Sequence, residues 1–132
     1  MRNRILFSFL AWVAVIVSVQ GKQKDFVLQS GQPVAIACSG SEAPVVHTSL
    51  DLLSRDLQTV LSATAHVDTN TGNIIVGTIG QSKLIEQAGI DISALKNKKQ
   101  AFLLTVSEDG KLVVAGSDSH GTAYGILEIS RL

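Results

Sequence analysis

The chain has 132 residues, its 11 basic and 11 acidic side chains cancel, and 45% of its residues are hydrophobic. A chain without net charge offers no extended basic surface, which argues against a protein that binds nucleic acid or anionic lipid. The length suits one globular domain. A single cysteine, Cys38, leaves no partner for an internal disulfide bond.

Residues 1–21 have the layout of a secretory signal peptide. Two arginines precede an apolar run from Ile5 to Val19, and small residues follow at the positions that a signal peptidase reads. The run is shorter than the roughly 20 residues that a membrane-spanning helix needs. We therefore expect removal of residues 1–21 on export. Residues 22–132 would then form a single α/β domain in the periplasm or outside the cell, without membrane contact after cleavage.

Two short apolar runs begin the exported part, and they flank the turn-forming residues 30–33. We expect each run to be a strand near a sheet edge, because Pro33 cannot donate a hydrogen bond to a strand ladder. The second run, Val34 to Cys38, ends in the only thiol. A catalytic thiol needs a neighbouring base and an electropositive setting, so Cys38 is interpreted as a small buried hydrophobic residue.

Residues 44–62 are predicted to form a helix, because their apolar positions recur at spacings of three and four. Asp51 and Arg55 lie on the opposite, polar face, where a solvated pair is expected in preference to a carbohydrate contact. The next apolar run, 74–79, is short and rich in β-branched residues, which is typical of a strand covered on both faces.

A short helix over residues 82–88 should follow, with Ser82 as its N-cap and Gly89 at its end. The glycines at 77 and 80 match neither the dinucleotide-binding nor the Walker spacing, so no cofactor is predicted. The clearest element comes later: two apolar runs flank Glu108-Asp109-Gly110, a strong hairpin signal. An amphipathic helix is predicted over residues 122–132.

This order of elements predicts an α/β (α+β) fold. Helices must cover a sheet to bury its apolar side chains, and a central strand after a long helix implies a crossover connection. We expect a mixed sheet that ends in an antiparallel hairpin, with the helices packed mainly on one face.

The polar segment after the last strand holds the candidate contact residues, Ser117, Asp118, Ser119 and His120, and Tyr124 follows in the helix. Serine, aspartate and histidine form catalytic triads, but sequence neighbours cannot generally align as nucleophile, base and orienting group. A polar turn in which Asp118 or Ser119 caps the next helix is the preferred interpretation, with Tyr124 buried. No catalytic residue is assigned. The spacing of the three histidines predicts no metal site.

Three segments resemble the N-terminal domain of glycoside hydrolase family 115, the xylan α-1,2-glucuronidases. They are the leucine-rich helix LDLLSRDLQTVL, the strand and turn IIVGTIGQSKLI, and the closing motif, which pairs Gly116-Ser-Asp118 with Gly121-Thr-x-Tyr124-Gly125. The order and spacing of the three segments agree with that family. The family usually has basic residues between the aspartate and the second glycine, where this chain has Ser119 and His120.

The resemblance implies an accessory domain of an exported, inverting glycoside hydrolase that removes glucuronic acid or its 4-O-methyl ether from xylan. It also implies a fold like the second domain of chitobiase and β-hexosaminidase. Catalysis in such enzymes belongs to a TIM barrel, so a downstream barrel of the same protein is the expected partner, and xylan-derived glucuronosides would be bound through the full enzyme.

The residues themselves support no self-contained active site. Hydrolysis of a glycosidic bond needs two carboxylates across the sugar, and few aromatic residues remain after position 21 to form a sugar platform. A structural, interdomain role is therefore expected. A free-standing secreted domain that binds carbohydrate or protein is the alternative.

Overall fold

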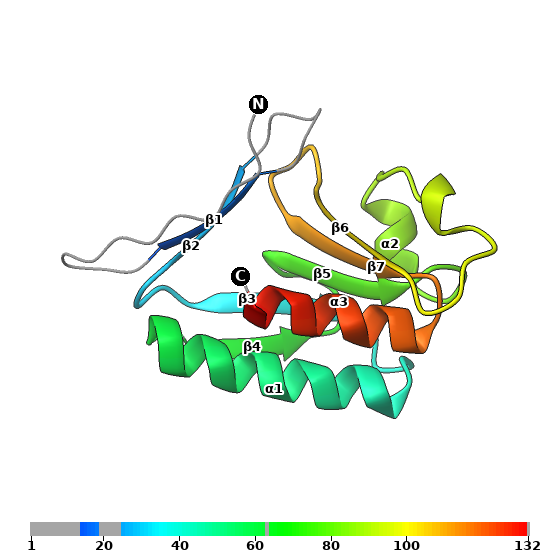
Figure 1. Cartoon of the computed structure of the whole chain (residues 1–132). Coiled ribbons are helices and arrows are strands. Elements are labelled where there is room, and N and C mark those ends of the chain that lie inside the picture. Colours follow the sequence, from blue (N-terminus) through cyan, green and yellow to red (C-terminus); the bar gives the residue numbers. More distant parts are fainter. Residues whose placement is uncertain (1–13, 19–24, 63, 132) are drawn as a thin grey trace.

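The structure is a computed structural model that describes residues 14–18, 25–62 and 64–131 (Figure 1). Its main sheet has five strands in the order β4-β3-β5-β7-β6. The strands are β3 (Val34–Cys38), β4 (Ala65–Asp68), β5 (Ile74–Thr78), β6 (Phe102–Val106) and β7 (Leu112–Gly116). The pairs β3/β4, β3/β5 and β5/β7 are parallel and β6/β7 is antiparallel. The predicted mixed sheet with a final hairpin is confirmed.

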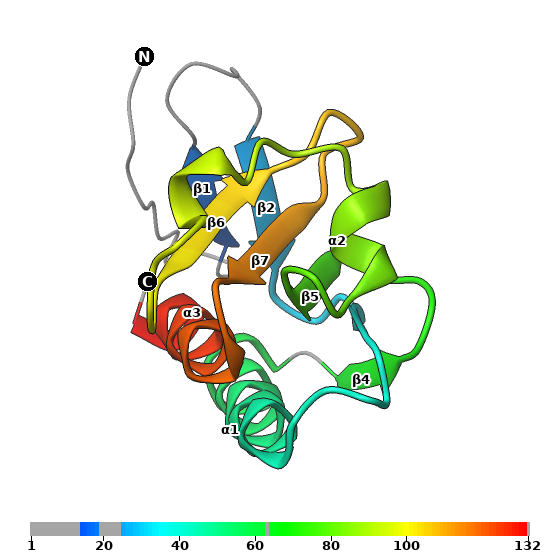
Figure 2. The same ribbon diagram turned by 90° about the vertical axis from the view of Figure 1, so that its right-hand side faces the viewer.

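Two long helices lie side by side on one face of the sheet, α1 (Pro44–Leu61) and α3 (Ser119–Arg131) (Figures 1 and 2). The short helix α2 (Lys83–Gln87) and the 3-10 turn η1 (Ser93–Leu95) pack on the other face. The larger hydrophobic cluster lies between the sheet and the long helices, and the smaller lies under α2 and η1. The expected helices mainly on one face are thus observed, and the α+β class is confirmed.

The elements with strong apolar patterns form where the sequence predicts them. Helix α1 ends one residue earlier than expected, at Leu61, and Ser62 adopts the left-handed conformation that closes the last turn. All five residues of β5 are buried, in keeping with its place between two parallel neighbours. Gly89 follows α2 at φ +69°, and Gly110 turns the β6–β7 hairpin at φ +82°.

The two predicted strands form, but they do not lie side by side. Strand β2 (Asp25–Gln29) does not share a sheet with β3, and β3 lies between β4 and β5, one strand in from the edge of the main sheet. Ile36, Ala37 and Cys38 are almost completely buried, so both faces of β3 are covered, as an interior strand requires. Pro33 immediately precedes β3 and therefore costs its ladder no hydrogen bond.

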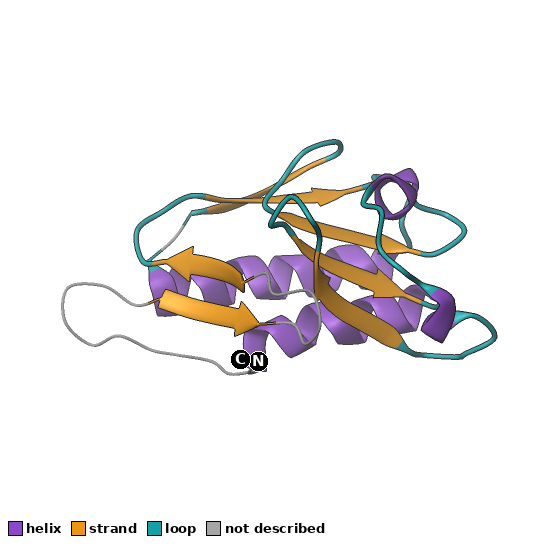
Figure 3. Cartoon of the chain, turned by 90° about the horizontal axis from the view of Figure 1, so that it is seen from above, coloured by secondary structure: helices purple, strands orange, loops and turns teal. Residues whose placement is uncertain are grey.

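Strand β2 pairs antiparallel with β1 (Ala14–Ser18), and the two form a separate two-stranded sheet (Figure 3). Strand β1 lies within the predicted signal peptide, the rest of which falls outside the described residues. Two other differences concern weak patterns. Strand β4 is short and mostly exposed, so the sequence contains no apolar run that would predict it. Helix α3 begins at Ser119 instead of the predicted Thr122.

Candidate functional site

Ser117 lies between β7 and α3 and ties this junction to the segment that enters β6. Its hydroxyl accepts a hydrogen bond of 3.0 Å from the Ala101 N–H, and its own N–H donates one of 2.8 Å to the Ala101 carbonyl. The side chain is therefore engaged with backbone. It holds two strand ends together and is not poised as a nucleophile.

Asp118, one of the two caps that the sequence predicted, is the N-cap of α3. Its carboxylate accepts a 2.8 Å hydrogen bond from the Gly121 N–H and a 3.0 Å hydrogen bond from the Gln100 N–H. The bonds from Gln100 and Gly121 hold the pKa of this carboxyl below its ordinary value of 3.8. One side chain thus caps the helix and fixes the loop before β6. Neighbouring Ser119 is half-buried in the first turn, and His120 is exposed.

The prediction that Tyr124 is buried was wrong, because 45% of its surface is exposed. The inward face of α3 is occupied by smaller residues, which let the helix lie close to the sheet. A Cβ atom on Gly125 would lie 2.5 Å from Val114 Cγ1, and one on Gly121 would overlap the Ala101 carbonyl oxygen. The two glycines bring the backbone against β6 and β7, and Tyr124 projects outward.

A buried hydrogen-bond network that the sequence did not reveal lies beside this junction. Glu42, only 6% exposed, accepts hydrogen bonds from the Thr78 N–H (3.0 Å) and the Thr78 hydroxyl (2.8 Å). The Thr78 hydroxyl lies 2.7 Å from that of Thr122 in α3. Since Thr78 gives its one hydroxyl proton to Glu42, Thr122 donates in this second contact.

This network joins three elements: the loop before α1, the end of β5 and the first turn of α3. Its residues follow or end strands at the same edge of the sheet, since β3, β5 and β7 are parallel. The parallel arrangement could have suggested the meeting of Glu42 and Thr78, but the strand order is not evident from the sequence. Both carboxylate oxygens are engaged with Thr78, so the network is structural.

Cys38 ends β3 just before this loop. The thiol is 1% exposed, as the sequence predicted for a core position. Burial, together with the nearby Glu42 carboxylate, raises the pKa of the Cys38 thiol to about 12. The thiol therefore stays protonated at neutral pH and cannot act as a nucleophile.

The chain leaves β3 toward α1 on one face of the sheet and leaves β5 toward α2 on the other. Adjacent parallel strands whose connections diverge in this way open a crevice at their carboxyl ends. A pocket of about 330 Å³ lies there, lined by Ser39, Ser41, Thr69, Asn70, Gln81, Lys83, Leu84 and Gln87. Hydroxyl and amide groups dominate this polar crevice, and Lys83 is its one charged residue. Such a lining suits a hydroxylated or anionic ligand.

The described residues hold no group of three or more histidine, cysteine or acidic side chains that could bind a metal ion. No helix in the described part of the chain is long and apolar enough to cross a membrane. The described residues thus provide buried structural polar groups, a polar crevice and an exposed helical layer.

A search of solved structures relates this chain to a much larger protein. It matches the family GH115 4-O-methyl-α-glucuronidase BtGH115A, described as having specificity for decorated arabinogalactans, with 96% sequence identity and a TM-score of 0.80. The match covers 81% of this chain and 14% of that chain. No family model and no curated protein matches the sequence. Over most of its length the chain is thus closely similar in sequence and fold to one segment of a glycoside hydrolase family 115 protein, which confirms the resemblance seen in its three motifs.

Proposed function

We propose that this chain is the non-catalytic N-terminal domain of an exported α-glucuronidase-like glycoside hydrolase, with a structural role between domains. The 96% identity to one segment of a family GH115 protein supports this assignment. Since the chain spans 14% of that protein, most of such an enzyme lies outside the domain. A catalytic TIM barrel in the same protein is the proposed partner.

The observation that carries the interdomain role is the position of the exposed apolar side chains. Six large hydrophobic residues in the described part of the chain are exposed, and five belong to the layer of α1 and α3: Val45, Leu52, Val60, Tyr124 and Leu127. Val45 and Leu52 are seven positions apart and share one face of α1. An apolar layer of this kind is typical of a surface that another domain covers.

The chemistry of the described side chains supports placing catalysis elsewhere. A glycosidase opposes two carboxylates across its substrate. Glu42 is the buried carboxylate, and Thr78 engages both its oxygens. The acidic residue of the closing motif, Asp118, caps a helix. Neither carboxylate is available to a sugar.

The substrate of the whole enzyme is proposed from two sources. The similar protein is described as a 4-O-methyl-α-glucuronidase with specificity for decorated arabinogalactans, and we assign the same substrate class here. Glucuronoxylan, which the family resemblance implies, is the competing substrate. Activity of the complete enzyme on 4-O-methylglucuronosyl side chains of the two polysaccharides decides between them.

The interdomain role is tested in the complete enzyme with Leu52→Glu and Leu127→Glu, which place charges in the exposed helical layer. Each is expected to lower the melting temperature of the complete enzyme, because a covered charge loses its hydration. The same changes in this domain alone should have little effect, since both positions are exposed there. Gln58→Glu, at an exposed polar position of α1, is the matched control. An equal effect in the domain and the complete enzyme would refute the role.

The polar crevice favours a second candidate function, a secreted domain that binds carbohydrate by itself. Calorimetry with glucuronoxylan and arabinogalactan oligosaccharides tests it directly. Binding that Lys83→Ala abolishes would support this second function. The interdomain proposal expects no measurable heat from this domain alone.

A further inference from the structure

Strand β2 has one pairing partner in the described structure, strand β1. The pair is antiparallel and runs over five positions, from Ala14 opposite Gln29 to Ser18 opposite Asp25. Neither strand belongs to the five-stranded sheet. Strand β1 lies within residues 1–21, the segment that we propose is removed on export.

Strand β2 has attachments to the domain besides its pairing with β1. Phe26 and Leu28 are buried in the larger hydrophobic cluster. At the end of the strand, the Ser30 hydroxyl and the Gly31 N–H each donate a 2.9 Å hydrogen bond to the Leu61 carbonyl at the end of α1. Removal of β1 would therefore leave β2 in place and uncover one edge of its backbone.

We propose that in the exported protein this edge of β2 accepts a β-strand from the remainder of the larger glycoside hydrolase, antiparallel as β1 is. An uncovered edge presents a row of N–H and C=O groups that readily pair with another strand. The inference rests on the proposed export, because without cleavage β1 stays paired with this edge of β2.

The occupant is assigned to the same protein for two reasons. The similar GH115 protein is about seven times as long as the matched segment, since that segment is 14% of it, so most of that protein lies outside the segment and is long enough to supply a strand. A strand in the same chain also has a high effective concentration at this edge, which a second molecule lacks.

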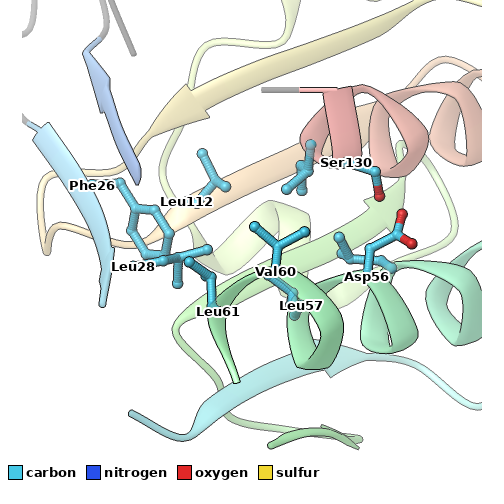
Figure 4. A pocket seen from close by; sticks show the side chains of 10 residues that line it. Phe26, Leu28, Asp56, Leu57, Val60, Leu61, Leu112 and Ser130 are labelled. Carbon is cyan, nitrogen blue, oxygen red and sulfur yellow. The ribbon is translucent and has the colours of Figure 1, made fainter. Parts of the chain in front are cut away.

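The surface beside β2 suits an apolar strand. A pocket of about 60 Å³ lies between β2 and the ends of α1 and α3 (Figure 4). Apolar side chains dominate its lining, with Asp56 and Ser130 at one side. Val60 lines it and is 59% exposed. Main-chain pairing with β2 would supply affinity, and one apolar side chain in this pocket would supply specificity.

The test follows hydrogen exchange at the backbone amides of residues 25–29. Mass spectrometry first establishes whether the exported chain lacks residues 1–21, and the amides of Ile36 and Val76 report the integrity of the main sheet. In the exported domain alone, alternate amides of β2 should exchange quickly. In the complete glycoside hydrolase the same amides should be protected at least tenfold.

A peptide with the sequence of residues 13–19, made soluble by terminal lysines, is the probe for the open edge. It should slow exchange in β2 and raise the melting temperature of the exported domain. The matched control is the same peptide with Val15→Pro and Val17→Pro, which cannot pair fully because proline lacks an N–H. Val60→Lys should weaken binding of the probe and leave the main sheet intact.

Several results would overturn the inference. Protection of β2 in the isolated exported domain would show that its edge is closed already, and a concentration-dependent dimer would assign the edge to a second copy. Fast exchange in the complete enzyme would exclude the assigned occupant. The main sheet of the exported domain could also exchange quickly. In that case the peptide of residues 13–19 must restore protection of the main-sheet amides, and a peptide that fails to do so contradicts the inference. Retention of residues 1–21 in the exported chain would refute the cleavage on which this inference rests. The interdomain role of α1 and α3 would be unaffected by that result.

Discussion

The Glu42 carboxylate accepts two hydrogen bonds from Thr78, one of 3.0 Å from the backbone N–H and one of 2.8 Å from the hydroxyl. This contact connects the loop before α1 with the end of β5, and Thr122 extends it to α3 through a 2.7 Å contact between hydroxyl groups. The core of the domain is otherwise mainly apolar. A fully engaged buried polar network of this kind fixes one arrangement of the elements that meet there.

Replacing Glu42 tests the contribution of this network to stability. Glu42→Gln keeps the size of the side chain but replaces one acceptor oxygen by an NH₂ donor. Either the N–H or the hydroxyl of Thr78 then loses its buried acceptor. We expect the free energy of unfolding to fall by about 1–3 kcal/mol, measured by urea denaturation. Glu108→Gln in the exposed β6–β7 turn is the control and should change little. Equal stabilities of the two variants would contradict a structural role for Glu42.

Close packing of α3 predicts that Gly121→Ala destabilises the domain although alanine favours helices. A Cβ atom at position 121 would overlap the Ala101 carbonyl oxygen, which is backbone and cannot rotate away. Overpacking of this kind costs about 1–3 kcal/mol, which thermal or urea unfolding would detect. At Gly40 no atom lies within 4 Å of an added Cβ, so Gly40→Ala should be close to neutral. A neutral Gly121→Ala would mean that α3 lies farther from the sheet.

Asp118 should make the domain less stable in acid. Its pKa is lower in the folded chain than its ordinary value of 3.8, so the carboxylate stabilises the fold above pH 3.8. That contribution is lost as the pH falls through the lowered pKa.

The pH dependence can be assigned to Asp118 by comparing variants. Asp118→Ala should lower the melting temperature at pH 7 and bring the variant closer to the unchanged chain in acid. Asp118→Asn should keep part of the cap, since asparagine also caps helices. Asp68 and Asp91 have lowered pKa values too. Because both residues are present in every variant, their contributions to the pH dependence of stability cancel when the variants are compared. A stability difference that does not change between pH 7 and pH 3 would contradict the assignment.

The buried thiol of Cys38 predicts slow chemical modification. With a pKa of about 12 and 1% exposure, it should not react with iodoacetamide at pH 8 while the domain is folded. Unfolding in guanidinium should permit complete labelling. Ser41→Cys places a second thiol at an exposed position three residues away and should be labelled in the folded protein. Rapid labelling of Cys38 itself would show that the end of β3 opens readily.

The sequence alone was sufficient for the elements with long or uninterrupted apolar patterns. Helix α1, strand β5 and the β6–β7 hairpin follow from spacing, β-branched content and turn residues, because those signals are local. A helix cap at Asp118 or Ser119 and the burial of Cys38 were predicted for the same reason. The three motifs also indicated the family, which the comparison with a solved structure confirmed.

Tertiary structure decided what depends on partners distant in the chain. Strand β3 became interior because β4 and β5 both pair with it, and β2 pairs with β1 instead of β3. Glu42 and Thr78 meet only because parallel strands end at the same edge of the sheet. Tyr124 is exposed because the small residues around Gly121 and Gly125 occupy the buried side of α3. Pairing, burial and close approach depend on neighbours that local patterns do not specify.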